Sequence, residues 1–120
     1  MSMKLSVRQA GDVALVDLSG RITLGEAAGE LRENLKELLA QGHGNIVLNL
    51  ADVSYIDSSG LGELVGGFAS VSSRGGRLKL LHLKGRALEL MQITKLYSVF
   101  ETFTDEAEAV RSFPSPAASA

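Results

Sequence analysis

The sequence predicts a single α/β domain with a mixed, four- to five-stranded β-sheet and about four α-helices. The chain has 120 residues, the size of one domain, and 45% of them are hydrophobic, which is typical of a globular protein. Short apolar runs alternate with segments whose apolar residues recur every three or four positions. This alternation favours right-handed crossovers between parallel strands, and two strands at the start add an antiparallel pair.

The first two strands are expected to form a hairpin. They cover residues 4–10 and 13–19 and are joined by the Gly11-Asp12 turn. The run Val13-Ala14-Leu15-Val16 is almost continuously apolar, which indicates a strand buried on both faces. Gly20-Arg21 is expected to end this strand.

The first helix is expected over residues 24–41. Thr23 is its predicted N-cap, Glu26 completes a capping box, and Gly42-His43-Gly44 ends the helix. Its inward positions follow helical spacing and are Leu24, Ala27, Ala28, Leu31, Leu35, Leu38 and Leu39.

The remaining elements continue the alternation. Ala51 to Ile56 is expected to be a connection, and Thr104 is the expected cap of the last helix. The domain is expected to span residues 1–113. Residues 114–120 form a tail that we expect to fray. The expected strands are 45–50, 77–81 and a short edge piece at 99–103, and the expected helices are 61–73, 85–94 and 105–113.

Composition limits the classes of function. The net charge of −2 disfavours binding to nucleic acid, and the lack of cysteine excludes disulfides, thiolate metal sites and cysteine catalysis. The two histidines have no second ligand at metal spacing, so neither a metal nor another cofactor is expected. We see no signal peptide and no apolar run near the roughly 20 residues of a membrane span, which predicts a cytoplasmic protein.

Two further groups of side chains are given structural roles. Five basic residues are expected to form a solvated rim: Arg74, Arg77, Lys79, Lys84 and Arg86. Six residues within and just after the helix expected over 85–94 are expected to fill the core: Ala87, Leu88, Met91, Ile93, Leu96 and Tyr97.

The most informative motif is Asp57-Ser58-Ser59-Gly60, which follows an apolar strand and precedes an amphipathic helix. The start of a helix presents free backbone N–H groups and a partial positive charge, so a phosphate on either hydroxyl would be well accommodated. One interpretation is therefore a phosphorylation switch. The other is an ordinary strand-to-helix turn, because Asp and Ser are common in turns and N-caps.

The residues around the motif leave alternatives open. Asp57 either orients the hydroxyl of Ser58 or caps the helix, and Ser59 is expected to act as a cap or as a secondary phosphoacceptor. Gly66 and Gly67 indicate close packing of this helix on the sheet, because glycine is costly inside a helix without such a reason.

The segment NIVLNLADVSYIDSSGLG, residues 45–62, resembles the core signature of the STAS domain, as found in bacterial anti-sigma factor antagonists. The resemblance extends from the first strand to about Phe113. It includes the Gly20-Arg21 turn, the Leu31-Arg32-Glu33 helix and the turn Gly75-Gly76-Arg77-Leu78 into a strand.

The resemblance implies that Ser58 is phosphorylated by a cognate anti-sigma factor, a small serine kinase with a histidine-kinase-like ATPase fold. The unphosphorylated antagonist then binds this kinase and frees a sigma factor, phosphorylation blocks binding, and a metal-dependent serine phosphatase reverses it. The resemblance also implies that Thr23 lies in a region that helps contact the kinase, where many family members carry Asp. Leu61, Gly62 and Glu63 are expected to border the docking surface, unless Leu61 packs in the core.

The resemblance implies a kinase substrate rather than an enzyme, and no His or Lys is placed to activate either serine. Two alternatives remain at this point. One is a STAS subunit of a stress-signalling or lipid-transport complex, although such subunits often lack the serine motif. The other is a receiver-like domain phosphorylated on Asp52 or Asp57, with Lys84 nearby, although no acidic pair follows an early strand to hold Mg²⁺.

Overall fold

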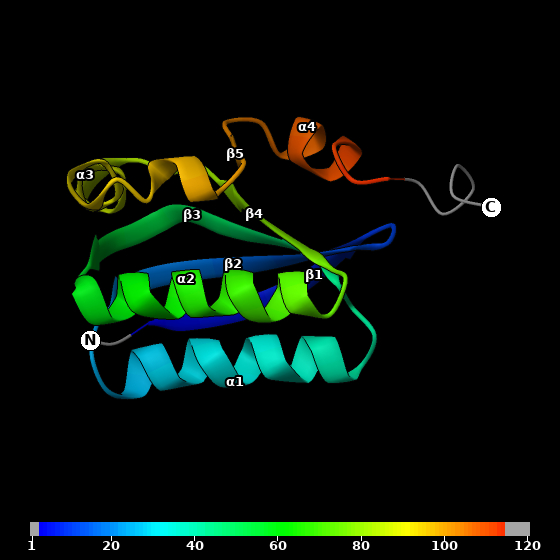
Figure 1. Ribbon diagram of the computed structural model, residues 1–120, viewed down its shortest axis with the longest axis horizontal. Helices are drawn as coiled ribbons and strands as arrows, with labels where there is room; N and C mark the ends of the chain where they lie inside the picture. Colours follow the sequence, from blue (N-terminus) through cyan, green and yellow to red (C-terminus); the bar gives the residue numbers. More distant parts are fainter. Residues whose placement is uncertain (1–2, 115–120) are drawn as a thin grey trace.

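The computed structural model describes residues 3–114 and confirms the predicted α/β class. Five strands and four α-helices alternate along the chain, with one short 3-10 helix (Figure 1). The elements are β1 (Lys4–Ala10), β2 (Val13–Ile22), α1 (Glu26–Ala40), β3 (Asn45–Ile56), α2 (Ser58–Ser73), β4 (Arg77–Leu81), α3 (Gly85–Thr94), η1 (Tyr97–Val99), β5 (Thr102–Phe103) and α4 (Glu106–Arg111).

The strands lie in the sheet in chain order, β1-β2-β3-β4-β5. β1 pairs with β2 in antiparallel orientation, and the other neighbouring pairs are parallel. A receiver-like domain has the doubly wound strand order 2-1-3-4-5. The observed order therefore contradicts the receiver-like alternative.

Both faces of the sheet carry a core. Ala14 and Val16 belong to the larger core with residues of α1, α2 and α3, whereas Val13 and Leu15 pack in a smaller core with Phe113 and α4. Alternate residues of a strand point to opposite faces, so β2 is buried on both sides, as predicted. Figure 1 shows α1 and α2 side by side on one side of the sheet, with α4 on the other.

β2 and β3 are longer than the sequence indicates, so both expected ends were wrong. β2 continues through Gly20 and Arg21 to Ile22, and β3 includes the stretch 51–56 that was expected to be a connection. The two strand ends pair with each other, Arg21 with Tyr55 and Ile22 with Ile56, after register shifts that are typical of β-bulges. These bulges interrupt the alternation of polar and apolar residues, and the sequence signal for a strand is lost there.

The start of α1 also differs from the prediction. α1 begins at Glu26 with Gly25 at the N-cap, and no side chain caps it, so the capping box of Thr23 and Glu26 is not formed. Gly25 has a φ of 103°, which lies in the region that favours glycine. Leu24 therefore precedes the helix instead of lying on its inner face, and it is 78% exposed.

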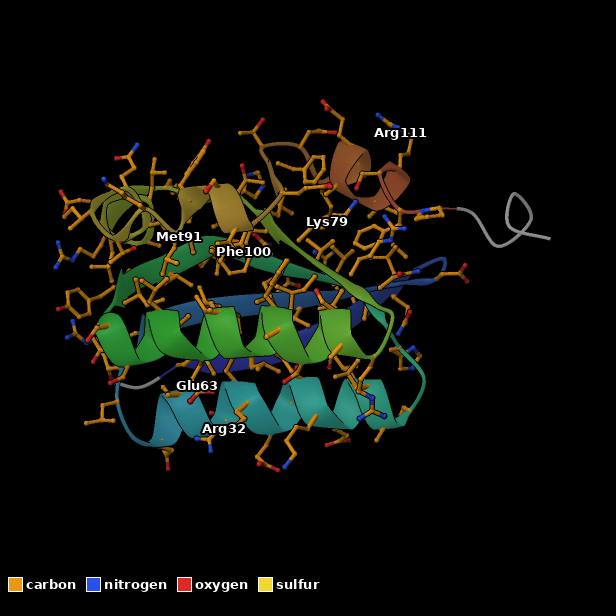
Figure 2. All side chains as sticks on the ribbon, viewed as in Figure 1. Arg32, Glu63, Lys79, Met91, Phe100 and Arg111 are labelled. Atoms are coloured by element: carbon orange, nitrogen blue, oxygen red, sulfur yellow. The ribbon has the colours of Figure 1, made fainter. Side chains whose placement is uncertain are left out.

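Several residues of the second half were assigned incorrectly. Asp105, not Thr104, caps α4 by accepting the N–H of Glu108 at 2.9 Å. Ile93 and Tyr97 are 67% and 47% exposed, whereas Met91 is fully buried in the predicted core (Figure 2). Residues 115–120 of the expected tail lie outside the described residues.

Lys79 is not part of a solvated rim. It is only 4% exposed, and its ammonium group donates to the hydroxyl of Ser112 at 2.9 Å and to the carbonyl of Ser112 at 3.2 Å. It also pairs with Glu101 at 3.0 Å and lies 4.4 Å from the ring centre of Phe113. The sequence does not reveal this, because the partners of Lys79 lie more than 20 positions away, just before β5 and just after α4.

The two central glycines of α2 were expected to pack closely on the sheet, but neither of them does. A Cβ at Gly67 would lie 2.5 Å from Cδ1 of Leu35, so this glycine permits close packing on α1. A Cβ at Gly66 would meet nothing within 4 Å. Only Gly67 thus has a packing role, and its partner is a helix.

Candidate functional site

Asp57 caps α2 at the carboxyl end of β3. Its Oδ1 accepts the backbone N–H of Gly60 at 2.8 Å, and its carbonyl oxygen accepts the N–H of Leu61 at 2.9 Å. The capping role predicted for Asp57 is therefore present, whereas Ser59 lies inside the helix and is not the cap. α2 begins at Ser58, three residues earlier than expected.

The second carboxylate oxygen of Asp57 holds the segment that follows β2. Oδ2 accepts the N–H of Leu24 at 3.1 Å, and the N–H of Asp57 donates to the carbonyl of Ile22 at 3.3 Å. The pKa of Asp57 is lowered, chiefly by the N–H of Gly60 and also by that of Leu24, against an opposing effect of desolvation. Asp57 is therefore ionised at neutral pH and joins two segments that are far apart in the sequence.

Gly60 allows α2 to start close to the end of β2. A Cβ at this position would collide with the carbonyl oxygen of Ile22, and it would lie 2.8 Å from Cγ1 of Ile56 and 2.9 Å from Cγ2 of Ile22. Any larger residue would push the helix start away from the strand. The glycine of the motif is thus required by close approach of the backbone.

The two serines of the motif differ in exposure. Ser58 is exposed in the first turn of α2, and Ser59 is half-buried. Among the hydrogen bonds of residues 3–114, none involves the hydroxyl of either serine. Asp57 supplies the cap of α2, so the helix start does not depend on the Ser58 hydroxyl.

The predicted border of the docking surface is only partly at the surface. Leu61 is 3% exposed and packs in the larger core, which is the alternative role considered for it above. Gly62 is exposed, and Glu63 is half-buried. Figure 2 shows Glu63 facing Arg32 of α1, and their Oε1 and Nε atoms are 3.3 Å apart.

Thr23 and Leu24 lie beside the start of α2 but have unequal exposure. Thr23 is half-buried, and its carbonyl accepts the N–H of Ala28 at 3.3 Å. Leu24 is exposed, and sequence reasoning assigned it to the core because it continues the helical spacing of α1. The glycine at position 25 was the available signal that the helix starts later.

Among residues 3–114, no group of three or more His, Asp or Glu side chains is placed to hold a metal ion. No helix in this part of the chain has the length and apolar character needed to cross a bilayer. The candidate site is the start of α2, where the hydrogen bonds of Asp57 meet the exposed side chain of Ser58.

Comparison with known proteins identifies the family. Residues 4–109 match the STAS domain family. The chain is 39% identical over 101 residues to the anti-sigma-B factor antagonist of Bacillus subtilis strain 168, an alignment that covers 84% of this chain and 91% of the relative.

Two solved structures are similar in fold. A candidate anti-sigma factor antagonist from Thermotoga maritima superposes with a TM-score of 0.82 at 26% identity, covering 90% of this chain and 92% of the other. The phosphorylated form of the Bacillus cell fate determinant SpoIIAA superposes with a TM-score of 0.72 at 22% identity, covering 91% and 98%. The chain belongs to the STAS domain family and, within it, to the anti-sigma factor antagonists.

Proposed function

We propose that this chain is a partner-switching regulator controlled at Ser58. The unphosphorylated chain binds an anti-sigma factor, which is itself a serine kinase of histidine-kinase-like ATPase fold, and thereby frees a sigma factor. Phosphorylation of Ser58 prevents this binding, and a metal-dependent serine phosphatase restores it. The chain is the substrate of these enzymes and supplies no catalytic group of its own.

The observation that carries the proposal is the division of roles between Asp57 and Ser58. Asp57 caps α2, so the exposed Ser58 hydroxyl has no structural hydrogen bond to give up when it is modified. A phosphate at this position lies at a helix N-terminus, where the macrodipole favours an anion by about 0.3–1 kcal/mol. Modification is therefore compatible with the native fold.

The same charge is unfavourable for docking. A phosphate adds a charge of roughly −1.5 to −2 beside the ionised Asp57. A partner surface that fits a neutral hydroxyl then meets repulsion and desolvation costs of several kcal/mol. A cost of about 3 kcal/mol already reduces affinity more than about a hundredfold, so no change of fold is needed.

The first test is to identify the kinase and the modified residue. The full chain is incubated with ATP and each purified candidate anti-sigma factor from the same genome, and the site is mapped by mass spectrometry. We expect one phosphate on Ser58, no labelling of Ser58→Ala, and unchanged labelling of the matched control Ser59→Ala. Labelling that persists in Ser58→Ala contradicts the assignment.

The second test compares binding of the two forms. We expect the unmodified chain and Ser58→Ala to bind the same anti-sigma factor, and the phosphorylated chain to bind at least about a hundredfold more weakly. Equal binding of both forms refutes the switch. Specific assembly with a membrane ATPase, and not with a small kinase, would instead favour a STAS subunit of a transport complex.

A further inference from the structure

We infer that Leu24 is an apolar docking residue for the anti-sigma factor, and that Asp57 is the residue that positions it. The inference rests on the proposed function and adds to it the part of the surface that contributes apolar contact. The expected occupant is an apolar pocket of the kinase next to the cleft that receives Ser58.

Leu24 is unusual in its exposure. Among residues 3–114 it is the most exposed large hydrophobic residue, at 78%, followed by Ile93 at 67% and Tyr97 at 47%. A single exposed apolar residue is common and requires no explanation by itself. The argument therefore depends on where Leu24 lies and on how its backbone is held.

The backbone around Leu24 is fixed on both sides. The N–H of Leu24 donates to Oδ2 of Asp57 at 3.1 Å, and the carbonyl of the preceding Thr23 accepts the N–H of Ala28 at 3.3 Å. Gly25 accepts the N–H of Gly29 at 3.0 Å. Leu24 thus projects from a rigid connection, and a rigid contact loses less conformational freedom on binding than a mobile one.

The position of Leu24 links it to the phosphorylation site. Asp57, which accepts its N–H, directly precedes Ser58, and the close approach of Gly60 to Ile22 holds the same two segments together. A kinase that reaches the hydroxyl of Ser58 therefore meets Leu24 at the edge of its contact surface. Burying an exposed leucine in an apolar pocket is favourable because its apolar area is removed from water.

The first experiment removes the side chain and leaves the loop intact. Binding of the purified anti-sigma factor that labels Ser58 is measured for the full chain, with ADP in place of ATP so that Ser58 stays unmodified. We expect Leu24→Ala to weaken binding about 10- to 100-fold. Val7→Ala is the matched control, because Val7 is an exposed apolar residue on β1, and β2 separates β1 from β3. This variant should bind within about twofold of the original chain.

The second experiment separates positioning by Asp57 from its capping role. In Asp57→Asn, the remaining carbonyl oxygen still caps α2, because Asn is as good an N-cap as Asp, but the amide nitrogen cannot accept the N–H of Leu24. We expect Asp57→Asn to weaken binding several-fold in the original chain and to have little further effect in Leu24→Ala. Urea unfolding checks that each variant is folded.

The outcomes distinguish this inference from the proposed function. Labelling of Ser58 together with binding of Leu24→Ala within about twofold overturns the docking role and leaves the switch intact. Effects of Asp57→Asn that are equal in both backgrounds overturn its positioning role. A chain that no anti-sigma factor binds or labels overturns both proposals.

Discussion

Around Asp57, single residues determine how two distant segments meet. Its two carboxylate oxygens accept N–H groups from α2 and from the connection ahead of α1, and its own N–H donates to Ile22. Gly60 removes the one side chain that would keep these segments apart. The motif that carries Ser58, the proposed phosphorylation site, is thus also the junction of β2, β3 and α2.

Gly60→Ala is expected to destabilise the protein by about 1–3 kcal/mol, because its Cβ would collide with the carbonyl oxygen of Ile22. The measurement is the free energy of unfolding in urea. Gly66→Ala is the matched control in the same helix, where a Cβ meets nothing within 4 Å. It should stabilise the protein by up to about 1 kcal/mol, because alanine favours helix more than glycine does. Equal effects of the two changes would contradict the steric role of Gly60.

The sequence predicted some of these residues and missed others for physical reasons. Asp57 was recognised as a possible cap because the preference of Asp for N-caps is local. Leu24 was assigned to the core because its burial depends on where the helix starts, and the choice between core and surface for Leu61 depends on the sheet beneath the helix. The bond between Asp57 and Leu24 spans 33 positions, and no local pattern indicates it.

Among the elements, α4 is attached to the sheet through a buried cation. Lys79 of β4 donates to the carbonyl and hydroxyl oxygens of Ser112, directly after α4, and its ammonium group faces the ring of Phe113. The helix itself has only six residues, too few to be stable without tertiary contacts. Its position therefore depends on Lys79 and on the small core that contains Phe113.

Lys79→Met is expected to loosen α4 before the rest of the fold. Methionine retains an apolar stem but leaves the carbonyl of Ser112 without its donor, which costs about 1–3 kcal/mol. Amide hydrogen exchange should rise in residues 106–111 more than in α2. Arg77→Met, an exposed site on the same strand, is the control and should leave exchange unchanged. Unaltered protection of α4 in Lys79→Met would argue against this attachment.

A network of charged side chains on the same face of the sheet also connects the sheet to α4. Arg8 of β1 donates to Asp17 of β2 at 2.6 Å and to Glu106 of α4 at 2.9 Å. The pKa values of both carboxyl groups are lowered, in each case chiefly by the hydrogen bond from Arg8. Both groups are ionised in the folded protein at lower pH than in the unfolded chain.

These shifts give stability a defined pH dependence. As the pH falls, these carboxyl groups bind protons in the unfolded chain before they bind them in the folded protein. Their contribution to folding stability is therefore full above about pH 4–4.5, and it is lost as the pH falls through the lower pKa values of the folded protein. Arg8→Met should reduce this loss of stability on acidification, measured by urea unfolding between pH 7 and pH 3. Lys4→Met removes the same charge from the same strand and should leave the acid dependence as it is. A steeper acid loss in Arg8→Met would contradict the network.

The order of elements could be predicted from the sequence, but their ends could not. β4 and α3 have the predicted bounds because glycines and a change in periodicity mark them in the sequence itself. The ends of β2 and β3 stabilise each other through pairing across 34 positions and through bulges, which the sequence does not display. Strand ends that depend on a distant partner were therefore placed too early.

For the molecule as a whole, the proposed switch changes charge and leaves the architecture in place. Phosphorylation of Ser58 is expected to alter the free energy of unfolding by no more than about 1 kcal/mol, because the helix start tolerates an anion. Thermal unfolding of the two forms, prepared with the cognate kinase, provides the measurement. A loss of several kcal/mol would indicate that the phosphate acts by disrupting the fold instead of blocking the surface.

The twelve-residue strand β3 has one practical consequence for assembly. At about 3.3 Å per residue it extends about 40 Å and carries the chain to the end of the sheet where Ser58 lies. Lys4 pairs with Ser19 near this same end, whereas α4 lies toward the opposite end (Figure 1). If the proposed switch at Ser58 operates, a fluorescent label or affinity tag attached beyond α4 should leave it unobstructed, whereas one attached ahead of β1 should compete with the proposed partner for space.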